Sequence, residues 1–298
     1  MPKLLRTPLT WMGGKGNFVS KILDLLPPHK QYVEPFGGGA SLLMAKIPSE
    51  LETYNDIDSR LVNFFRVLRD PELFGRFYQM AVWTPTSREE FNLCKDNLES
   101  DDLVIAAHRF YVVARQSFGG FFGRSWTTTV TQPNYRNSIL HHLPAMHERL
   151  IDVQVEHADW RRILKRYDGP DYFAYCDPPY VSSTRGAGQY THELSDDDHQ
   201  DLVDRLLTYK GKVILSGYPN DIYKRLESNG WARRDFKTVS YAVARTKAFD
   251  NKGSGKVMEK HSRIEALWLN YDPNVQVRNE PLVEDKEKET CSIFDLVE

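Results

Sequence analysis

Two segments of the chain, residues 31–58 and 172–217, repeat the same order of elements, and this repetition restricts the fold to a narrow class. In the first segment, expected strands over 31–34 and 51–55 enclose a glycine-rich turn and a good helix-forming stretch, residues 40–46. Parallel strands need a long crossover connection, which is usually a helix. The alternation therefore predicts an α/β fold, a Rossmann-like doubly wound sheet that binds ligands at the carboxyl ends of its strands.

The second segment follows the same logic. An apolar run over 172–176 is typical of a buried strand, and Ser195, followed by three aspartates, is a typical N-cap of a helix. A glycine then breaks the helix before the next expected strand. Further on, residues 236–244 and 263–271 alternate like antiparallel strands, which we expect at an edge of the sheet.

The stretch from residue 62 to residue 150 interrupts the alternation with helical patterns that are rich in aromatic residues. We interpret 62–150 as an inserted, mainly helical domain within a ligand-binding domain made of residues 1–61 and 151–273. Residues 274–298 are rich in Glu and Lys, and we expect them to form a mobile tail.

The composition argues against several other classes of protein. No apolar run approaches the ~18 residues of a membrane span, and the N-terminus lacks a signal-peptide core, so we expect no membrane association. The spacing of Cys94, Cys176 and Cys291 suggests neither a disulfide framework nor a zinc site. We therefore expect a reducing, cytoplasmic environment and no bound metal.

The tetrapeptide Asp177-Pro178-Pro179-Tyr180 follows the apolar strand and carries the most specific chemistry in the chain. A carboxylate and the carbonyl before a proline can accept both hydrogens of an exocyclic NH2 group. Two prolines fix the backbone and remove donors, so the carbonyls point in set directions. The tyrosine ring offers a face on which a nucleobase can stack, worth roughly 1–3 kcal/mol. The alternative is an ordinary Pro-Pro turn with a surface tyrosine.

The turn Phe36-Gly37-Gly38-Gly39 lies between a strand and a helix, where glycines permit close approach of the backbone to a ligand. Asp56 ends the next strand, at the position from which an acid binds ribose hydroxyls in nucleotide-binding α/β folds. Alternatively, Asp56 forms a turn or caps the helix that starts near Ser59, and Asp58 is the ribose ligand instead. The complete G-x-G-x-x-G pattern is absent, which disfavours a dinucleotide.

Upstream lies Trp11-Met12-Gly13-Gly14-Lys15-Gly16, ahead of an amphipathic helix. A tryptophan, glycines and a lysine can wrap a small ligand that carries a carboxylate. Alternatively, the segment is a flexible turn whose Trp11 packs on the core. The phosphate-loop pattern of an NTPase is incomplete here, so we reject that function.

Together these segments resemble the DNA adenine-N6 methyltransferases of the Dam type, the D12 family. The family's pattern appears in order as Trp11-Met12-Gly13-Gly14-Lys15, Glu34-Pro35-Phe36-Gly37-Gly38-Gly39, Asn55-Asp56, Asp177-Pro178-Pro179-Tyr180 and the final strand from Arg263 to Tyr271. The resemblance implies S-adenosylmethionine as methyl donor, with Trp11, Lys15, Asp56 and Asp177 at donor-contacting positions. It also implies that 62–150 is the target-recognition region, that 1–61 with 151–273 is catalytic, and that restriction–modification is a setting for the enzyme.

A DNA-binding face is expected in the insertion. From Leu103 to His147 the chain has four arginines and no Asp or Glu, a local charge of 4 − 0 = +4. Arg115 and Arg124 flank glycines that would let a loop enter a groove, where Arg reads guanine or contacts phosphate. Lys252 and Lys256 belong to a second basic, glycine-containing stretch that we expect to clamp phosphates. Alternatively, the arginines and lysines are solvated surface residues, and the aromatic residues of the insertion belong to its core.

These observations predict site-specific methylation of adenine N6 in double-stranded DNA. The target base must leave the stack, because its amino group cannot meet a methyl donor inside a duplex. We expect neither a covalent enzyme intermediate nor a metal, and we place His192 and His199 at the surface. The alternatives are an RNA adenine or N4-cytosine methyltransferase and a non-catalytic DNA-binding protein on the same fold.

Overall fold

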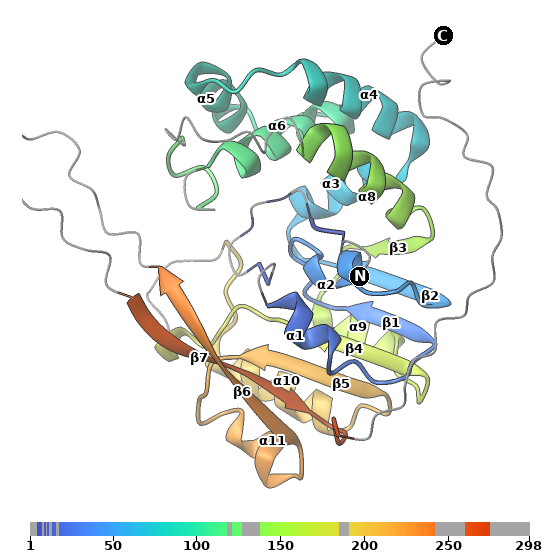
Figure 1. Cartoon of the computed structure of the whole chain (residues 1–298), viewed down its shortest axis with the longest axis vertical. Helices are drawn as coiled ribbons and strands as arrows, with labels where there is room; N and C mark the ends of the chain where they lie inside the picture. Colours follow the sequence, from blue (N-terminus) through green and yellow to red (C-terminus); the bar gives the residue numbers. More distant parts are fainter. Residues whose placement is uncertain are drawn as a thin grey trace, which may run out of the picture.

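The computed structural model describes residues 5–7, 9, 11, 14–15, 18–117, 121–126, 138–184, 191–241 and 260–274. These residues build one seven-stranded sheet with helices packed against it (Figure 1). The strands are β1 (Gln31–Glu34), β2 (Leu51–Asn55), β3 (Val153–Glu156), β4 (Tyr172–Cys176), β5 (Lys212–Gly217), β6 (Ala232–Tyr241) and β7 (Lys260–Leu269). The helices are α1 (Val19–Leu23), α2 (Ser41–Ala45), α3 (Ser59–Arg69), α4 (Pro71–Trp83), α5 (Arg88–Asp96), α6 (Leu103–Gln116), α8 (Leu143–Leu150), α9 (Trp160–Arg166), α10 (Asp196–Leu207) and α11 (Lys224–Ser228), with a π-helix, η2 (Ser138–His142), and a 3-10 turn, η3 (Ser182–Thr184).

The strand order is β3-β2-β1-β4-β5-β7-β6. The strands from β3 to β5 pair in parallel, whereas β7 is antiparallel to β5 and β6 is antiparallel to β7. This arrangement confirms the predicted doubly wound α/β sheet and the antiparallel pair at its edge. The order of the strands reverses between β1 and β4, and α/β sheets bind ligands at such a point.

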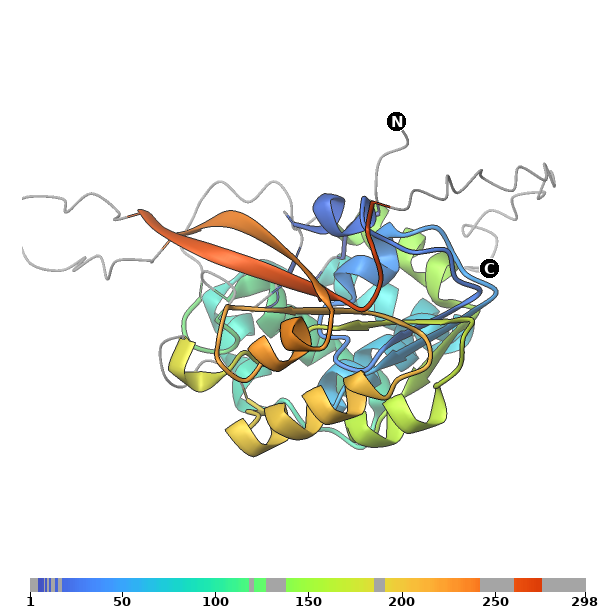
Figure 2. The ribbon, with the colours of Figure 1, turned by 90° about the horizontal axis from the view of Figure 1, so that it is seen from below.

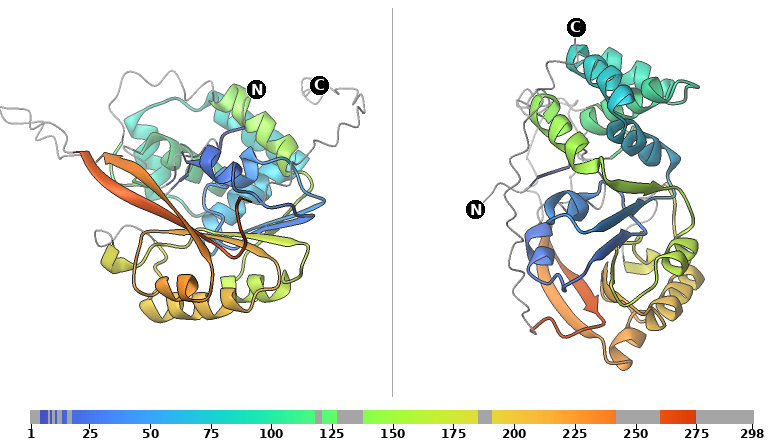
Figure 3. Two further views of the ribbon diagram at one scale, coloured as in Figure 1. Left: turned by 60° about the horizontal axis from the view of Figure 1, so that its bottom comes forward. Right: turned by 90° about the vertical axis from the view of Figure 1, so that its right-hand side faces the viewer.

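The two faces of the sheet are covered by different helices because side chains alternate along each strand. Val33 and Ala174 pack with α9, α10 and α11, whereas Tyr32 and Phe173 pack with α1 and α2. Seen along the sheet in the right-hand view of Figure 3, the blue helices lie on one side and the yellow and gold helices on the other. Both faces of the central strand β4 are therefore buried, as its apolar sequence predicts.

The edge strands β6 and β7 are the longest in the sheet, and they form a twisted ribbon (Figure 2). Only the end of β7 pairs with β5, because the register runs from Ile214 opposite Leu269 to Gly217 opposite Ala266. Glu265 is the next residue of β7, so it lies where this strand passes the carboxyl end of β5. That end of the sheet also holds the loop that follows β4.

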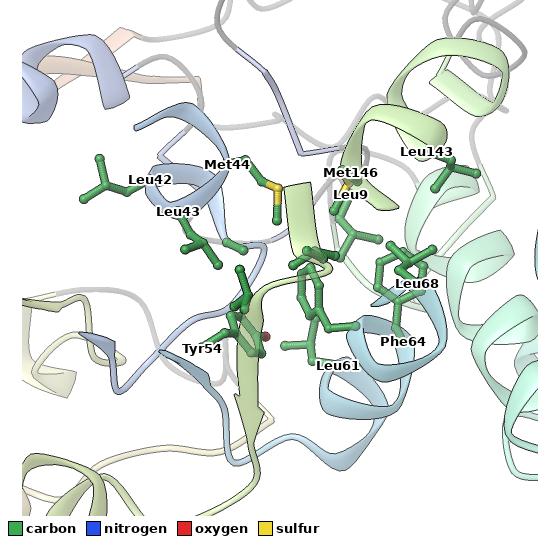
Figure 4. Close-up of a cluster of buried hydrophobic side chains, with 14 of the residues drawn as sticks. Leu9, Leu42, Leu43, Met44, Tyr54, Leu61, Phe64, Leu68, Leu143 and Met146 are labelled. Atoms are coloured by element: carbon green, nitrogen blue, oxygen red, sulfur yellow. The ribbon is translucent and has the colours of Figure 1, made fainter. Parts of the chain in front are cut away.

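Most helices between β2 and β3 share one hydrophobic cluster with the sheet, whereas α5 packs on α6 in a separate small cluster. Figure 4 shows Leu43 of α2, Tyr54 of β2, Phe64 of α3 and Leu143 of α8 around this cluster. The expected domain boundary after residue 61 falls inside α3, and α3 contacts both the sheet and the other helices. The helical segment is therefore joined to the sheet by a continuous core.

The predicted helix after Ser195 begins as expected, with a capping box formed by Ser195 and Asp198. The surface position that we expected for His199 is wrong, whereas His192 is exposed. His199 is fully buried, and its Nδ1 lies 2.9 Å from the hydroxyl of Tyr223. It precedes Leu202 by three residues and therefore lies on the face of α10 that packs against the sheet.

Candidate functional site

A cavity of about 530 Å³ opens at the carboxyl ends of the central parallel strands. This volume lies in the range of small-molecule sites, roughly 300–1,000 Å³. The cavity is lined by Trp11, Gly14, Lys15, residues 34–39, Ser41, Leu42, residues 56–58, Leu61, residues 158–161, Tyr175, residues 177–179, residues 191–194 and Asp198. It lies where the strand order reverses, so the topology and the cavity indicate the same place.

The glycine turn after β1 is shaped by its neighbours on β2. A Cβ atom at Gly37 would lie 2.2 Å from the ring of Tyr54, and Gly38 has a φ of +48°. The N–H of Gly38 donates to Oδ2 of Asp56 over 2.8 Å. Close packing against β2 thus requires these glycines, and the carboxylate of Asp56 fixes the turn at the mouth of the cavity.

Asp56 and Asp58 have different surroundings. Asp58 caps α3, and its carboxylate binds Arg60 through two hydrogen bonds of 2.9 and 2.6 Å. Among the described residues, no cation forms such a pair with Asp56, whose Oδ1 accepts from the N–H of Asp58 over 2.8 Å. Burial raises the pKa of Asp56 above its ordinary value. The helix cap that was an alternative role for Asp56 therefore belongs to Asp58, and Asp56 keeps acceptor capacity at the cavity.

Glu34 is a cavity residue to which the sequence analysis gave no role. Its Oε1 accepts from the hydroxyl of Tyr32 and from the N–H of Leu43, whereas Oε2 is buried without a partner among the described residues. Burial raises the pKa of this carboxyl to about 7. Its position at the carboxyl end of β1 is the sequence signal that could have identified it.

Trp11 joins the glycine turn to the helical segment. Its ring centre lies 5.7 Å from that of Phe110 on α6 and 5.9 Å from that of Phe122. A Cβ atom at Gly39 would lie 3.4 Å from Cβ of Trp11. Trp11 therefore both packs on the core and lines the cavity, so the two readings of this residue are compatible. Phe36, beside the same turn, packs against Trp160, and the two ring centres lie 6.0 Å apart. Both residues line the cavity.

The Asp-Pro-Pro-Tyr loop leaves β4 beside the cavity, and residues 177–179 line it. Oδ1 of Asp177 lies 3.0 Å from Nζ of Lys15. Burial raises the pKa of Asp177, and Lys15 opposes this rise only in part because Glu265 adds to it. The structure thus brings the two expected donor-contacting residues Lys15 and Asp177 into direct contact with each other.

Tyr180 is oriented differently from our expectation of an open stacking face. Its side chain is only 5% exposed, and its ring packs edge-to-face against Tyr218 at 4.7 Å. Its hydroxyl hydrogen-bonds with Lys15, Ser216 and Glu265. A base can stack on this ring only if the groups that cover it in this structure move aside.

The residues expected to contact DNA lie in several places. Arg115 is half-buried in the last turn of α6. Arg124 is exposed, and its guanidinium lies 5.3 Å from the ring centre of Phe121. Lys252 and Lys256 lie outside the described residues, as does the tail beyond residue 274. Phe110 of α6 is buried in the core.

Comparison with known proteins agrees with this geometry. Residues 11–243 match the family of D12 class N6 adenine-specific DNA methyltransferases. The chain belongs to this family. It is an adenine-specific DNA methyltransferase, and methyltransferases of this kind in general use S-adenosylmethionine. Membership decides between the alternatives left open by the sequence, since RNA, N4-cytosine and purely binding functions do not fit the family.

Several curated proteins are similar to the chain over most of its length. The type II methyltransferase M1.LlaDCHI of Lactococcus lactis subsp. cremoris is 27% identical over 279 residues, which cover 86% of this chain and 94% of that protein. The DNA adenine methylase of Vibrio cholerae is 26% identical over 245 residues, 75% of this chain and 85% of that protein. The type II methyltransferase M.MjaIII of Methanocaldococcus jannaschii is 26% identical over 251 residues, 73% and 86% of the two chains. The type II names agree with the expected restriction–modification setting.

Within the described ranges, no group of three or more His, Cys, Asp or Glu side chains is arranged to hold a metal ion. In the same part of the chain, no helix has both the length and the apolar character that spanning a bilayer requires.

Proposed function

We propose that this methyltransferase modifies the exocyclic amine of an adenine flipped out of double-stranded DNA, at a site made by the cavity and the Asp-Pro-Pro-Tyr loop. The observation that carries the proposal is the position of Asp177. Its carboxylate stands in the wall of the cavity, at the carboxyl end of β4 and across from the glycine turn of β1. A methyl donor in the cavity and an amino group on this loop would therefore be neighbours.

S-adenosylmethionine would supply the methyl group: transfer forms a nitrogen–carbon bond, breaks a sulfur–carbon bond to leave a neutral thioether, and the methylated amine then loses one proton to solvent water. The cavity suits this donor because carboxylates outnumber lysines and arginines among its lining residues, and the donor carries a sulfonium and an ammonium. Asp56 has unused acceptor capacity for ribose hydroxyls, and Oε2 of Glu34 is buried without a described partner. Trp11, Phe36, Gly37 and Gly39 would shape the surrounding wall, with Lys15 beside Asp177.

The loop residues would hold the target base. Asp177 and the carbonyl of Pro178 would accept the two amino hydrogens, which orients the nitrogen lone pair toward the methyl group. Pro178 and Pro179 fix the direction of these acceptors. Tyr180 would stack on the adenine once its ring is uncovered. Binding and orientation of this kind need no covalent bond between the base and the protein.

The helical segment, residues 62–150, is our proposal for the target-recognition region, inserted between the two parts of the catalytic domain. The exposed guanidinium of Arg124 and the acid-free composition around it support this assignment. Lys252 and Lys256 would contact phosphates from the second basic stretch. Their sequence context is the support for that role.

The test is replacement of Asp177 by alanine and by asparagine. Methyl transfer from tritiated S-adenosylmethionine into unmethylated plasmid DNA should fall at least tenfold, a barrier increase of about 1.4 kcal/mol or more. Donor affinity and thermal unfolding should stay close to wild type. If both variants kept more than a tenth of wild-type turnover, Asp177 would not be the group that binds the amine.

A further inference from the structure

Five side chains from separate parts of the chain meet at the back of the Asp-Pro-Pro-Tyr loop. Lys15 comes from the N-terminal segment, Asp177 and Tyr180 from the loop, Ser216 from β5 and Glu265 from β7. Nζ of Lys15 lies 3.0 Å from Asp177 and 2.9 Å from Oε1 of Glu265. Oγ of Ser216 lies 3.1 Å from Oε1 of Glu265 and 3.1 Å from the hydroxyl of Tyr180, which also donates to Glu265. We call this group the loop anchor.

Glu265 occupies the centre of the loop anchor without lining the cavity. It is 6% exposed, and every other residue of the group except Asp177 is similarly buried. On β7 it follows the same alternation as Leu267 and Leu269, which are core residues. A carboxylate at a position where an aliphatic side chain would fit is a departure from the core pattern, and such departures are expected at functional sites.

The contacts of Glu265 reach both ends of the loop. It holds the ammonium of Lys15, which in turn holds the carboxylate of Asp177, and it accepts directly from the hydroxyl of Tyr180. β7 pairs with β6 at Glu265 and with β5 from Ala266 onward, so a continuous sheet supports these contacts. We propose that Glu265 is a positioning residue for methyl transfer, which sets the carboxylate of Asp177 through Lys15 and fixes the ring of Tyr180 through its hydroxyl.

The charges of the loop anchor give Glu265 a second effect. Lys15 contributes +1 and the two carboxylates contribute −2, so the group carries one excess negative charge beside the loop. Methyl transfer places positive charge on the adenine amino nitrogen, which in the proposed function lies against Asp177. A preorganised negative charge at this place stabilises the transition state more than the ground state. The inference rests on the proposed role of Asp177 and adds a residue that never touches the substrate.

The test compares Glu265→Gln, Lys15→Met and Asp177→Asn with wild type in the full chain. Asp168→Asn is the control, because this carboxylate is also paired with a cation, Arg205 at 2.8 Å, but lies away from the cavity. Single-turnover methyl transfer into unmethylated plasmid DNA is measured from pH 5 to pH 9, together with donor affinity and thermal unfolding. Glu265→Gln should lower kcat roughly 10- to 100-fold, the range for one buried charge-assisted hydrogen bond, while donor affinity and the KM for DNA change less than threefold.

The pH profile separates positioning from a general loss of structure. Asp177 must be ionised to accept the amino hydrogens, so activity should fall as pH drops through its pKa. The titratable groups that interact with it are Lys15 from the N-terminal segment, Glu265 from β7, Tyr180 from its own loop, Tyr175 and Cys176 from β4, and Tyr223 ahead of α11. Glu265→Gln should move the acid limb to lower pH, because a repulsive charge is lost. Lys15→Met should move it to higher pH, by about one unit in each case.

Several outcomes would overturn the inference. Unchanged kcat and an unmoved acid limb in Glu265→Gln, with Asp177→Asn inactive, would refute the role of Glu265 and leave the proposed function standing. Full activity in Asp177→Asn would instead refute the proposed site. An equal loss of kcat in Asp168→Asn would assign the effect to stability. If Glu265→Gln does not fold, Ser216→Ala decides. This variant removes one hydroxyl that contacts Glu265 and Tyr180, but Glu265 keeps its contacts with Lys15 and Tyr180, so kcat should fall only roughly 2- to 10-fold.

Discussion

Replacing Asp56 by alanine should weaken donor binding, and the structure sets the size of the effect. The carboxylate would lose its contact with ribose, a charge-assisted hydrogen bond worth roughly 1.5–3 kcal/mol, or about a 10- to 150-fold rise in Kd. It would also release the N–H groups of Gly38 and Asp58, each now held over 2.8 Å. The thermal stability should fall as well, by roughly 1–3 kcal/mol, because buried donors lose their acceptor.

Asp56→Asn separates the two effects. Asparagine keeps one acceptor oxygen for the turn but places an NH2 group where the second N–H was accepted, so we expect a smaller loss of stability. Donor affinity in wild type should fall with decreasing pH as Asp56 is protonated, and burial moves this transition above the ordinary pKa of 3.8. The asparagine variant should lack that transition, since its side chain does not titrate.

The assay is isothermal titration calorimetry with S-adenosylmethionine, run beside thermal unfolding of the same preparations. Asp58→Ala is the companion variant, because Asp58 lines the cavity but its carboxylate is engaged by Arg60. Wild-type affinity in a folded Asp56→Ala protein would refute the ribose contact. A large loss in Asp58→Ala alone would transfer that contact to Asp58.

Two further predictions concern the DNA face and the stability of the fold. Arg115→Ala and Arg124→Ala are tested by affinity for cognate and scrambled duplexes over a salt series. Loss of a guanine contact should weaken binding by about 1–3 kcal/mol on the cognate site only, whereas loss of a phosphate contact should weaken binding to all sequences and reduce the salt slope by about one unit. Unchanged binding in both variants would place these arginines in solvated surface. Glu52→Gln should lower the free energy of unfolding by about 3–5 kcal/mol, because it leaves two buried cations unpaired, Lys46 and Arg149. Burial raises the pKa of Glu52, but the two cations outweigh this effect and lower the pKa below 4.5. The stability that Glu52 contributes should therefore be present above pH 4.5 and disappear as pH falls through the lowered pKa. Chemical denaturation between pH 3 and pH 7 measures this, and equal pH dependence of wild type and variant would contradict it.

The sequence by itself determined every strand of the sheet except β3, and it determined the edge of the sheet where the site lies. Strand β2 and the glycine turn could be recognised because alternation, helix propensity and turn residues are local properties of the chain. The carboxyl ends of parallel strands share one edge, so the sequence alone places Asp56 and Asp177 near a common ligand. Family resemblance then supplied the chemistry of that ligand.

Only the tertiary structure decided which side chains meet at the loop. Lys15 and Tyr180 are 165 residues apart, and Tyr180 and Glu265 are 85 apart, yet all three share hydrogen bonds. No local pattern specifies that an N-terminal lysine turns toward Asp177, because this depends on how β7 passes β5 and how the N-terminal segment packs. The burial of His199 was also decided by the tertiary structure, because its polar side chain lies on the face of α10 that packs against the sheet. Local sequence fixes periodicity, whereas the partners of buried polar groups are fixed by packing between distant elements.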